Sequence, residues 1–107
     1  MSHVTTHVLD AALGQPAARI TVALSGPDGT VIALGETDAD GRVPELGPDL
    51  LPAGDYRLEF ETGPYFAASG RATFYPRVTV DFILKDATHH HVPLLLSPFA
   101  YSTYRGS

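Results

Sequence analysis

The stretch RVTVDFILK, residues 77–85, gives the clearest structural signal in the chain. Apolar side chains at positions 78, 80, 82 and 84 alternate with polar ones at 77, 79, 81 and 85, and Ile83 is the only apolar residue on the polar side. Successive side chains of a β-strand point to opposite faces of the sheet. The stretch therefore predicts a strand with one face in the core and the other toward water.

The same alternation occurs at residues 20–24 and 56–60, and each of these segments is predicted to be a strand with one buried face. Residues 31–36 are predicted as a weaker strand. The segments at 20–24 and 31–36 are expected to pair as a hairpin, because the residues between them are typical of a turn. Turns are predicted at 25–29, 38–41 and 52–55.

Short elements are expected throughout, because nine prolines and ten glycines interrupt a chain of 107 residues. Only residues 64–69 leave room for a helix, of about two turns. The sequence thus predicts an all-β fold, a β-sandwich of five to eight short strands. With 44% hydrophobic residues, 18% charged residues and no linker-like segment, residues 1–107 are expected to form one domain.

Composition also excludes several functional classes. The formal charge is -5 and the seven basic residues are scattered, which argues against a nucleic-acid partner. The absence of cysteine excludes disulfides, thiolate zinc sites and cysteine nucleophiles. No segment approaches the roughly 20 apolar residues of a membrane span, and the first residues lack the pattern of a secretion signal, so we expect a cytoplasmic protein with no membrane partner.

Segments 3–9 and 89–97 differ from the other predicted strands, because both of their faces carry apolar side chains. Leu9 and Leu95 would stand in water if the second faces were exposed. A strand that is apolar on both faces indicates that another chain covers the outer one, so we expect an oligomer. The outer face holds His3, Thr5, His7 and Leu9 on the first segment and His89, His91, Pro93 and Leu95 on the second.

Pro93 bears on the position of its strand in the sheet. Proline has no N–H to donate to a neighbouring strand and fits poorly in a strand that is paired on both sides. We therefore do not expect the segment around residues 94–96 to be an ordinary central strand.

His7, His91 and Arg42 are the candidate catalytic residues. Both histidines lie on the outer faces just described, and imidazole is the usual proton carrier near neutral pH. Arg42 directly follows a predicted turn, where its guanidinium could bind a planar anion or stabilise an oxyanion. Each residue also fits a structural role, as a hydrogen-bonded histidine or a solvated arginine.

A metal site is the alternative use of the histidines. His89 and His91 share a strand face and could chelate an ion together with His7. No carboxylate or thiolate is near in sequence to complete the ligand set, so neither a metal nor another cofactor is expected. By alternation, His90 should point to the core.

Three segments of the chain together resemble the transthyretin-related 5-hydroxyisourate hydrolases. They are Thr-His-Val-Leu-Asp at 6–10, Thr-Asp-Ala-Asp-Gly-Arg at 37–42, and HHHVPLLLSPFAYSTYRGS at 89–107 with its closing Tyr-Arg-Gly-Ser. The resemblance implies a transthyretin-like sandwich of eight strands with one short helix. It also implies a homotetramer, built as a dimer of dimers, whose central channel is lined by the first strand and the last two strands.

The resemblance further implies a catalytic set of His7, Arg42 and His91, with Tyr104 and Ser107 beside the substrate. The implied reaction is hydrolysis of 5-hydroxyisourate to 2-oxo-4-hydroxy-4-carboxy-5-ureidoimidazoline in urate degradation, without a cofactor. The alternative is a transthyretin-like carrier that binds a small ligand in the channel without turnover. The bulk of Tyr104 argues against the carrier, because it should divide a through-channel into two shallow sites.

Overall fold

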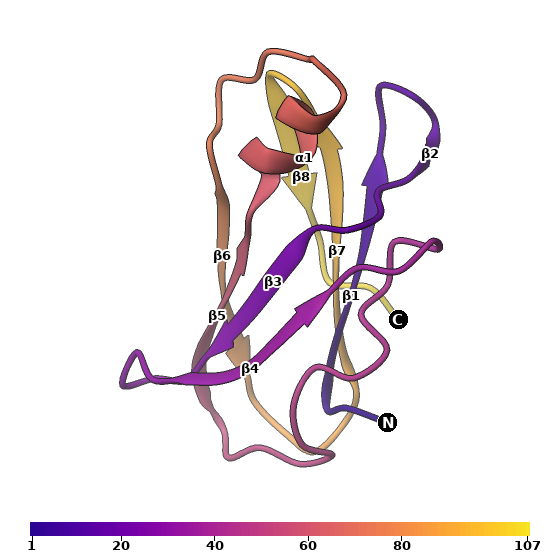
Figure 1. The fold of residues 1–107 in the computed structure, drawn as a ribbon. Helices are drawn as coiled ribbons and strands as arrows, with labels where there is room; N and C mark the ends of the chain where they lie inside the picture. Colours follow the sequence, from indigo (N-terminus) through magenta and orange to yellow (C-terminus); the bar gives the residue numbers. More distant parts are fainter.

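In the computed structural model, which describes residues 1–107, the chain folds into two stacked four-stranded sheets (Figure 1). The first sheet has the strand order β2-β1-β7-β8 and the second has the order β4-β3-β5-β6. A single short helix, α1, follows β5. The elements are β1 (Val4–Asp10), β2 (Gln15–Pro16), β3 (Thr21–Ser25), β4 (Val31–Glu36), β5 (Gly54–Phe60), α1 (Thr62–Ala68), β6 (Val78–Leu84), β7 (His90–Ser97) and β8 (Ala100–Thr103).

The predicted sandwich is confirmed, and so are the strands read from alternation. Strand β6 covers the stretch that gave the clearest signal, and β3 and β4 pair as the expected antiparallel hairpin. The helix begins two residues earlier than predicted and ends one residue earlier. Strands β2 and β8 were missed because β2 has two residues and β8 is exposed along its whole length, so neither shows alternating burial.

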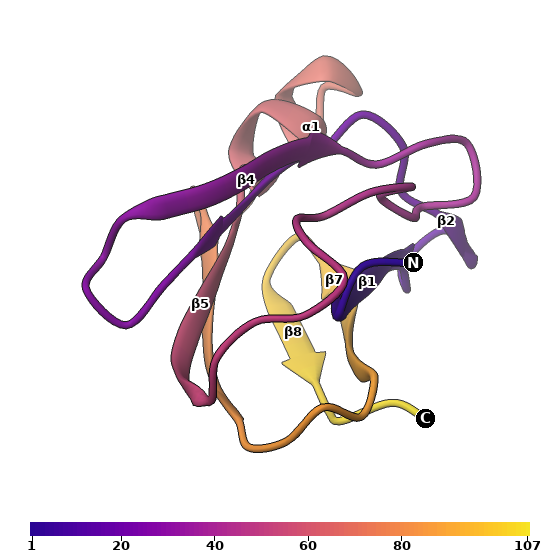
Figure 2. The ribbon, with the colours of Figure 1, turned by 90° about the horizontal axis from the view of Figure 1, so that it is seen from below.

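Buried apolar side chains from both sheets form one core between the layers. Figure 2 shows the two layers from below, with β4 and β5 in one and β1, β7 and β8 in the other. The largest fully buried side chains are Phe60 at the end of β5 and Phe66 in α1, so the helix closes one end of the core. No helix in the structure has the length and apolarity needed to span a membrane.

Pro93 lies in a central strand, so the expectation drawn from it was wrong. Strand β7 pairs with β1 in parallel and with β8 in an antiparallel ladder. The β7–β8 ladder begins at Leu94 and Thr103, one residue beyond the proline. The Thr103 hydroxyl donates to the Pro93 carbonyl at 2.7 Å, so the proline faces β8 just where that strand ends. Proline is normally unfavourable in a central strand because it has no N–H to donate to the neighbouring strand. Here no backbone hydrogen bond of the ladder is lost, because β8 has already ended.

His3 is also placed differently from the prediction. It precedes β1 and is only 3% exposed, so it does not share the outer face with His7. Its Nε2 lies 3.0 Å from the carbonyl oxygens of both Asp86 and Thr88, and its Nδ1 accepts from the Leu51 N–H at 2.9 Å. His3 therefore fastens the start of β1 to two loops.

A buried carboxylate fixes the other end of β1. The side chain of Asp10 is 0% exposed and accepts hydrogen bonds at 2.7 Å from the Tyr65 hydroxyl and from Nη2 of Arg71. Its other oxygen accepts from the Leu13 N–H. Burial raises the pKa of Asp10, but the hydrogen bonds from Arg71 and Tyr65 outweigh it and hold the pKa below its ordinary value. This network ties β1 to the helix across the two layers.

Replacing Asp10 should destabilise the fold in a pH-dependent way. Asp10→Ala leaves the Arg71 charge without its partner and should lower the free energy of unfolding by about 3 kcal/mol at pH 7 in urea titrations. Because the folded-state pKa is lowered, the stabilisation is present above the unfolded pKa of about 4 and is lost as the pH falls through the folded value. The difference in free energy of unfolding between wild type and variant should therefore become smaller in acid.

The matched control is Asp81→Ala, which breaks an exposed pair with Arg57. Exposed pairs contribute little, so this variant should unfold close to wild type. An equal loss of unfolding free energy in Asp10→Ala and Asp81→Ala would contradict the structural role of Asp10.

Candidate active site

An open depression of about 600 Å³ lies on the outer face of the first sheet. It brings together all five predicted site residues, which come from the two ends and the middle of the chain. The residues that line it include Thr5, His7, Asp38, Arg42, His89, His91, Tyr104, Gly106 and Ser107.

The parallel pairing of β1 and β7 places the two histidines. In its register Thr5 lies opposite His91 and His7 lies opposite Pro93, so both imidazoles project from one face of adjacent strands. His7 donates its Nε2–H to the carbonyl oxygen of Asp40 at 2.8 Å. A carbonyl can only accept, so this bond fixes the tautomer of neutral His7 and leaves its Nδ1 as a free acceptor.

Arg42 is held by the tight turn that precedes it. One carboxylate oxygen of Asp38 accepts from the backbone N–H groups of Asp40 and Arg42 at 2.9 and 3.1 Å. The carbonyl of Gly41 accepts from the Val8 N–H at 2.8 Å, which docks the turn on β1. Gly41 has a φ of 77°, and an added Cβ would collide with the Val8 carbonyl oxygen, so only glycine fits. The guanidinium forms no ion pair with any carboxylate of the chain.

The last residues reach the depression by a backbone contact with β7. The N–H of Gly106 donates to the His91 carbonyl at 2.8 Å. An added Cβ at Gly106 would lie 2.6 Å from Cδ2 of the His91 ring, so the glycine backbone packs directly against the imidazole. This contact brings Ser107 and the 58% exposed side chain of Tyr104 to the rim.

The surroundings of His91 favour its neutral form. Burial lowers the pKa of His91, and the nearby charges of Arg42, His89 and His7 lower it further. A neutral imidazole at pH 7 can take a proton from a bound water. The depression therefore combines an available base, a fixed-tautomer histidine and an unpaired guanidinium.

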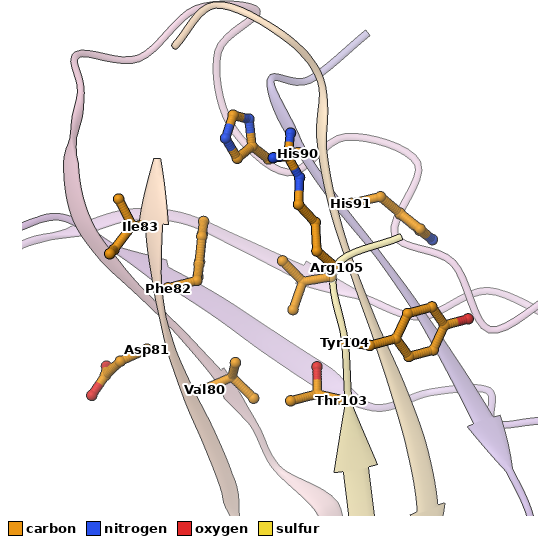
Figure 3. Close-up of a pocket in the computed structure, with 10 residues that line it drawn as sticks. Val80, Asp81, Phe82, Ile83, His90, His91, Thr103, Tyr104 and Arg105 are labelled. Atoms are coloured by element: carbon orange, nitrogen blue, oxygen red, sulfur yellow. The ribbon is translucent and has the colours of Figure 1, made fainter. Parts of the chain in front are cut away.

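A second cavity, of about 270 Å³, lies between the sheets at the β6 and β8 edges (Figure 3). Val80, Phe82 and Val92 give it apolar walls, and neither His7 nor Arg42 reaches it. Figure 3 shows His90 on the side of Phe82 and His91 on the opposite side of β7, so the expectation for His90 is confirmed. Among the described residues 1–107, no group of three His, Cys, Asp or Glu side chains is placed to hold a metal ion.

Several contributors to the site were not identified from the sequence. Thr5 alternates with His7 and so shares its face, a signal that strand periodicity contains. Asp38 has the position of a turn-capping residue. The packing of Gly106 on His91 has no local signal, because the two residues meet only through the sheet.

The effect of the Arg42 charge on the pKa of His91 should be measurable. Arg42→Gln removes a cation that disfavours imidazolium, so the pKa of His91 should rise toward its ordinary value in NMR titrations. The control Arg77→Gln, whose guanidinium pairs with Glu61, should leave it unchanged. An unchanged pKa in Arg42→Gln would place the guanidinium away from His91.

Comparisons with known proteins agree over the whole chain. The model of the HIUase/Transthyretin family matches residues 4–106. The "5-hydroxyisourate hydrolase" of Caulobacter vibrioides is 47% identical over 115 residues, covering 100% of both chains. The structure of Klebsiella pneumoniae 5-hydroxyisourate hydrolase matches with a TM-score of 0.90 and 43% identity, over 100% of this chain and 94% of that one. The structure of transthyretin from Sparus aurata matches with a TM-score of 0.92 and 35% identity, over 99% of this chain and 97% of that one.

These likenesses confirm the transthyretin-like sandwich with one short helix. Full-length similarity to hydrolases also confirms the expectation of a hydrolase enzyme. The chain belongs to the HIUase/Transthyretin family.

Proposed function

We propose that this protein hydrolyses 5-hydroxyisourate in the depression on its first sheet, with residues 1–107 acting as one hydrolase domain. The observation that carries the proposal is the meeting of His7, Arg42 and His91 in one open site. The Caulobacter relative named as a hydrolase of this substrate is similar over the entire chain. The reaction opens the six-membered ring at an amide bond and gives 2-oxo-4-hydroxy-4-carboxy-5-ureidoimidazoline, a step of urate degradation.

The two histidines activate the attacking water. Neutral His91 takes one proton of the water, while the free Nδ1 of His7 accepts a hydrogen bond from the other hydrogen and orients the molecule. The new C–O bond forms as the ring carbonyl becomes an oxyanion. The C–N bond then breaks, and the proton held by His91 passes to the leaving nitrogen.

Arg42 supplies the positive charge that the reaction needs. Its unpaired guanidinium binds the substrate anion and stabilises the oxyanion, an interaction that strengthens as charge develops. Tyr104 and Ser107 border the same depression and contact the bound ring. These groups can perform the hydrolysis by proton transfer and hydrogen bonding alone, so the mechanism needs no metal or cofactor.

A homotetramer completes the site in this proposal. Leu9 and Leu95 are opposite each other in the β1–β7 register and remain only half-buried on the histidine face. A dimer of dimers that joins these faces covers both leucines and turns the open depression into a channel-lining pocket. Exclusion of bulk water there strengthens the interaction of Arg42 with the anion.

Substitution of the three residues tests the chemistry. His7→Gln, Arg42→Gln and His91→Gln should each lower kcat by roughly 10²–10⁴-fold, the usual range for losing an acid–base or oxyanion group. The assay is the ultraviolet decay of freshly generated 5-hydroxyisourate, corrected for its spontaneous rate. Arg77→Gln, directly before β6 of the other sheet, should retain wild-type kcat.

The same assay separates the hydrolase from a carrier. A carrier would bind the compound in the depression without accelerating its decay. Wild-type protein that leaves the decay rate unchanged would rule out the proposed hydrolase.

Assembly is tested at Leu95. Leu95→Arg places a charge on the face proposed to join subunits, so sedimentation should show loss of the tetramer and the activity should fall with it. The control is Leu34→Arg, because Leu34 is exposed on the other sheet. A Leu95→Arg tetramer of normal activity would contradict an interface on this face.

A further inference from the structure

The Thr5 hydroxyl joins two imidazoles in the depression. Its Oγ1 lies 2.8 Å from Nδ1 of His91 and 2.6 Å from Nε2 of His89. The two rings are 6.1 Å apart between centroids, which is too far for a direct hydrogen bond. The hydroxyl is thus the only link between them.

A hydroxyl has one hydrogen, so the two bonds cannot be made independently. If Thr5 donates to His89, it must accept from the Nδ1–H of His91, and Nε2 of His91 is then the free base. If Thr5 donates to His91, the bonds reverse, and Nε2 of His91 carries the proton. One hydrogen-bond chain therefore couples the tautomer of His91 to the protonation of His89.

We propose that Thr5 and His89 form a proton relay that serves His91 during hydrolysis. As His91 takes the proton of the attacking water at Nε2, its Nδ1–H passes to the Thr5 oxygen and the Thr5 hydrogen passes to Nε2 of His89. His91 ends neutral and His89 ends as imidazolium. The reverse transfer returns the proton through His91 to the leaving nitrogen, so the cycle has no net gain or loss of protons.

The electrostatics of the depression favour such a relay. A proton kept on His91 would be half-buried beside Arg42 and His7, and these same features lower its pKa. His89 is exposed, so water solvates an imidazolium there more readily. The other titratable groups among the lining residues are Asp38, Tyr104, the terminal carboxylate of Ser107 and the amino group of Met1, which pairs with Asp49 at 3.4 Å. Asp38 uses one carboxylate oxygen to hold the Arg42 turn.

The relay rests on the proposed function, and kinetics on paired variants test it. Thr5→Val keeps the side-chain shape but removes the bridge, so kcat should fall about tenfold while KM stays within about twofold, a small part of the usual acid–base contribution. Thr5→Ser restores a hydroxyl and should recover most of the rate. Thr79→Val, on the exposed face of β6, is the matched control and should match wild type.

Added imidazole distinguishes a proton carrier from a structural residue. His89→Ala should lose a similar factor in kcat and regain it with imidazole buffer, because the position is open to solvent. Thr5→Val should not respond to the buffer. Full activity in Thr5→Val, no gain from serine over valine at position 5, or no rescue of His89→Ala would each overturn the relay.

A measurement without substrate separates this idea from the proposed function. The ¹⁵N shifts of neutral His91 should report mainly the Nδ1–H tautomer in wild type, and Thr5→Val should shift the population toward Nε2–H. The same tautomer in both proteins would overturn the relay even if the enzyme is active. An inactive wild type with the expected shifts would instead refute the hydrolase and leave the hydrogen-bond chain intact.

Discussion

The parallel pairing of β1 with β7 is the constraint on which the site depends. The paired residues are more than 80 positions apart in the chain, and the ladder runs from Val4 opposite His90 to Asp10 opposite Leu96. A shift of this register by one residue would turn His91 into the core and His90 outward. The core contacts of the flanking residues therefore fix the register and, with it, the chemistry on the opposite face.

Two glycines carry the rest of the site to this pair of strands. Gly41 lets the backbone of the Arg42 turn approach β1, and Gly106 lets the last residues pack against the His91 ring. Both contacts use backbone atoms, so they position the arginine and the tyrosine without occupying the functional side chains. Side-chain oxygens then complete the arrangement, since Asp38 holds the turn and Thr5 links two imidazoles.

Arg42 is the only lysine or arginine that lines the site, in a protein whose net charge is -5. Arg42 and three imidazoles gather in it without forming an ion pair. Burial and the charge of Arg42 lower the pKa of His91, so a second positive charge beside the guanidinium is disfavoured. The unpaired guanidinium has free donors that suit binding of a small anionic ring.

The sequence by itself determined the sandwich, most of its strands and the candidate residues His7, Arg42 and His91. Alternation of apolar and polar side chains is a local property, so a single strand shows it without its neighbours. Resemblance to a family points to individual residues by their motifs, so it also needs no knowledge of contacts between strands. Only the tertiary structure decided that Pro93 is tolerated in a central strand, that His3 is buried away from the site, and that Thr5 bridges two imidazoles. Each of these three findings depends on which strands are neighbours in the sheet and on where a neighbouring strand ends. Pairing between segments that are far apart in the chain leaves no trace in the local sequence pattern.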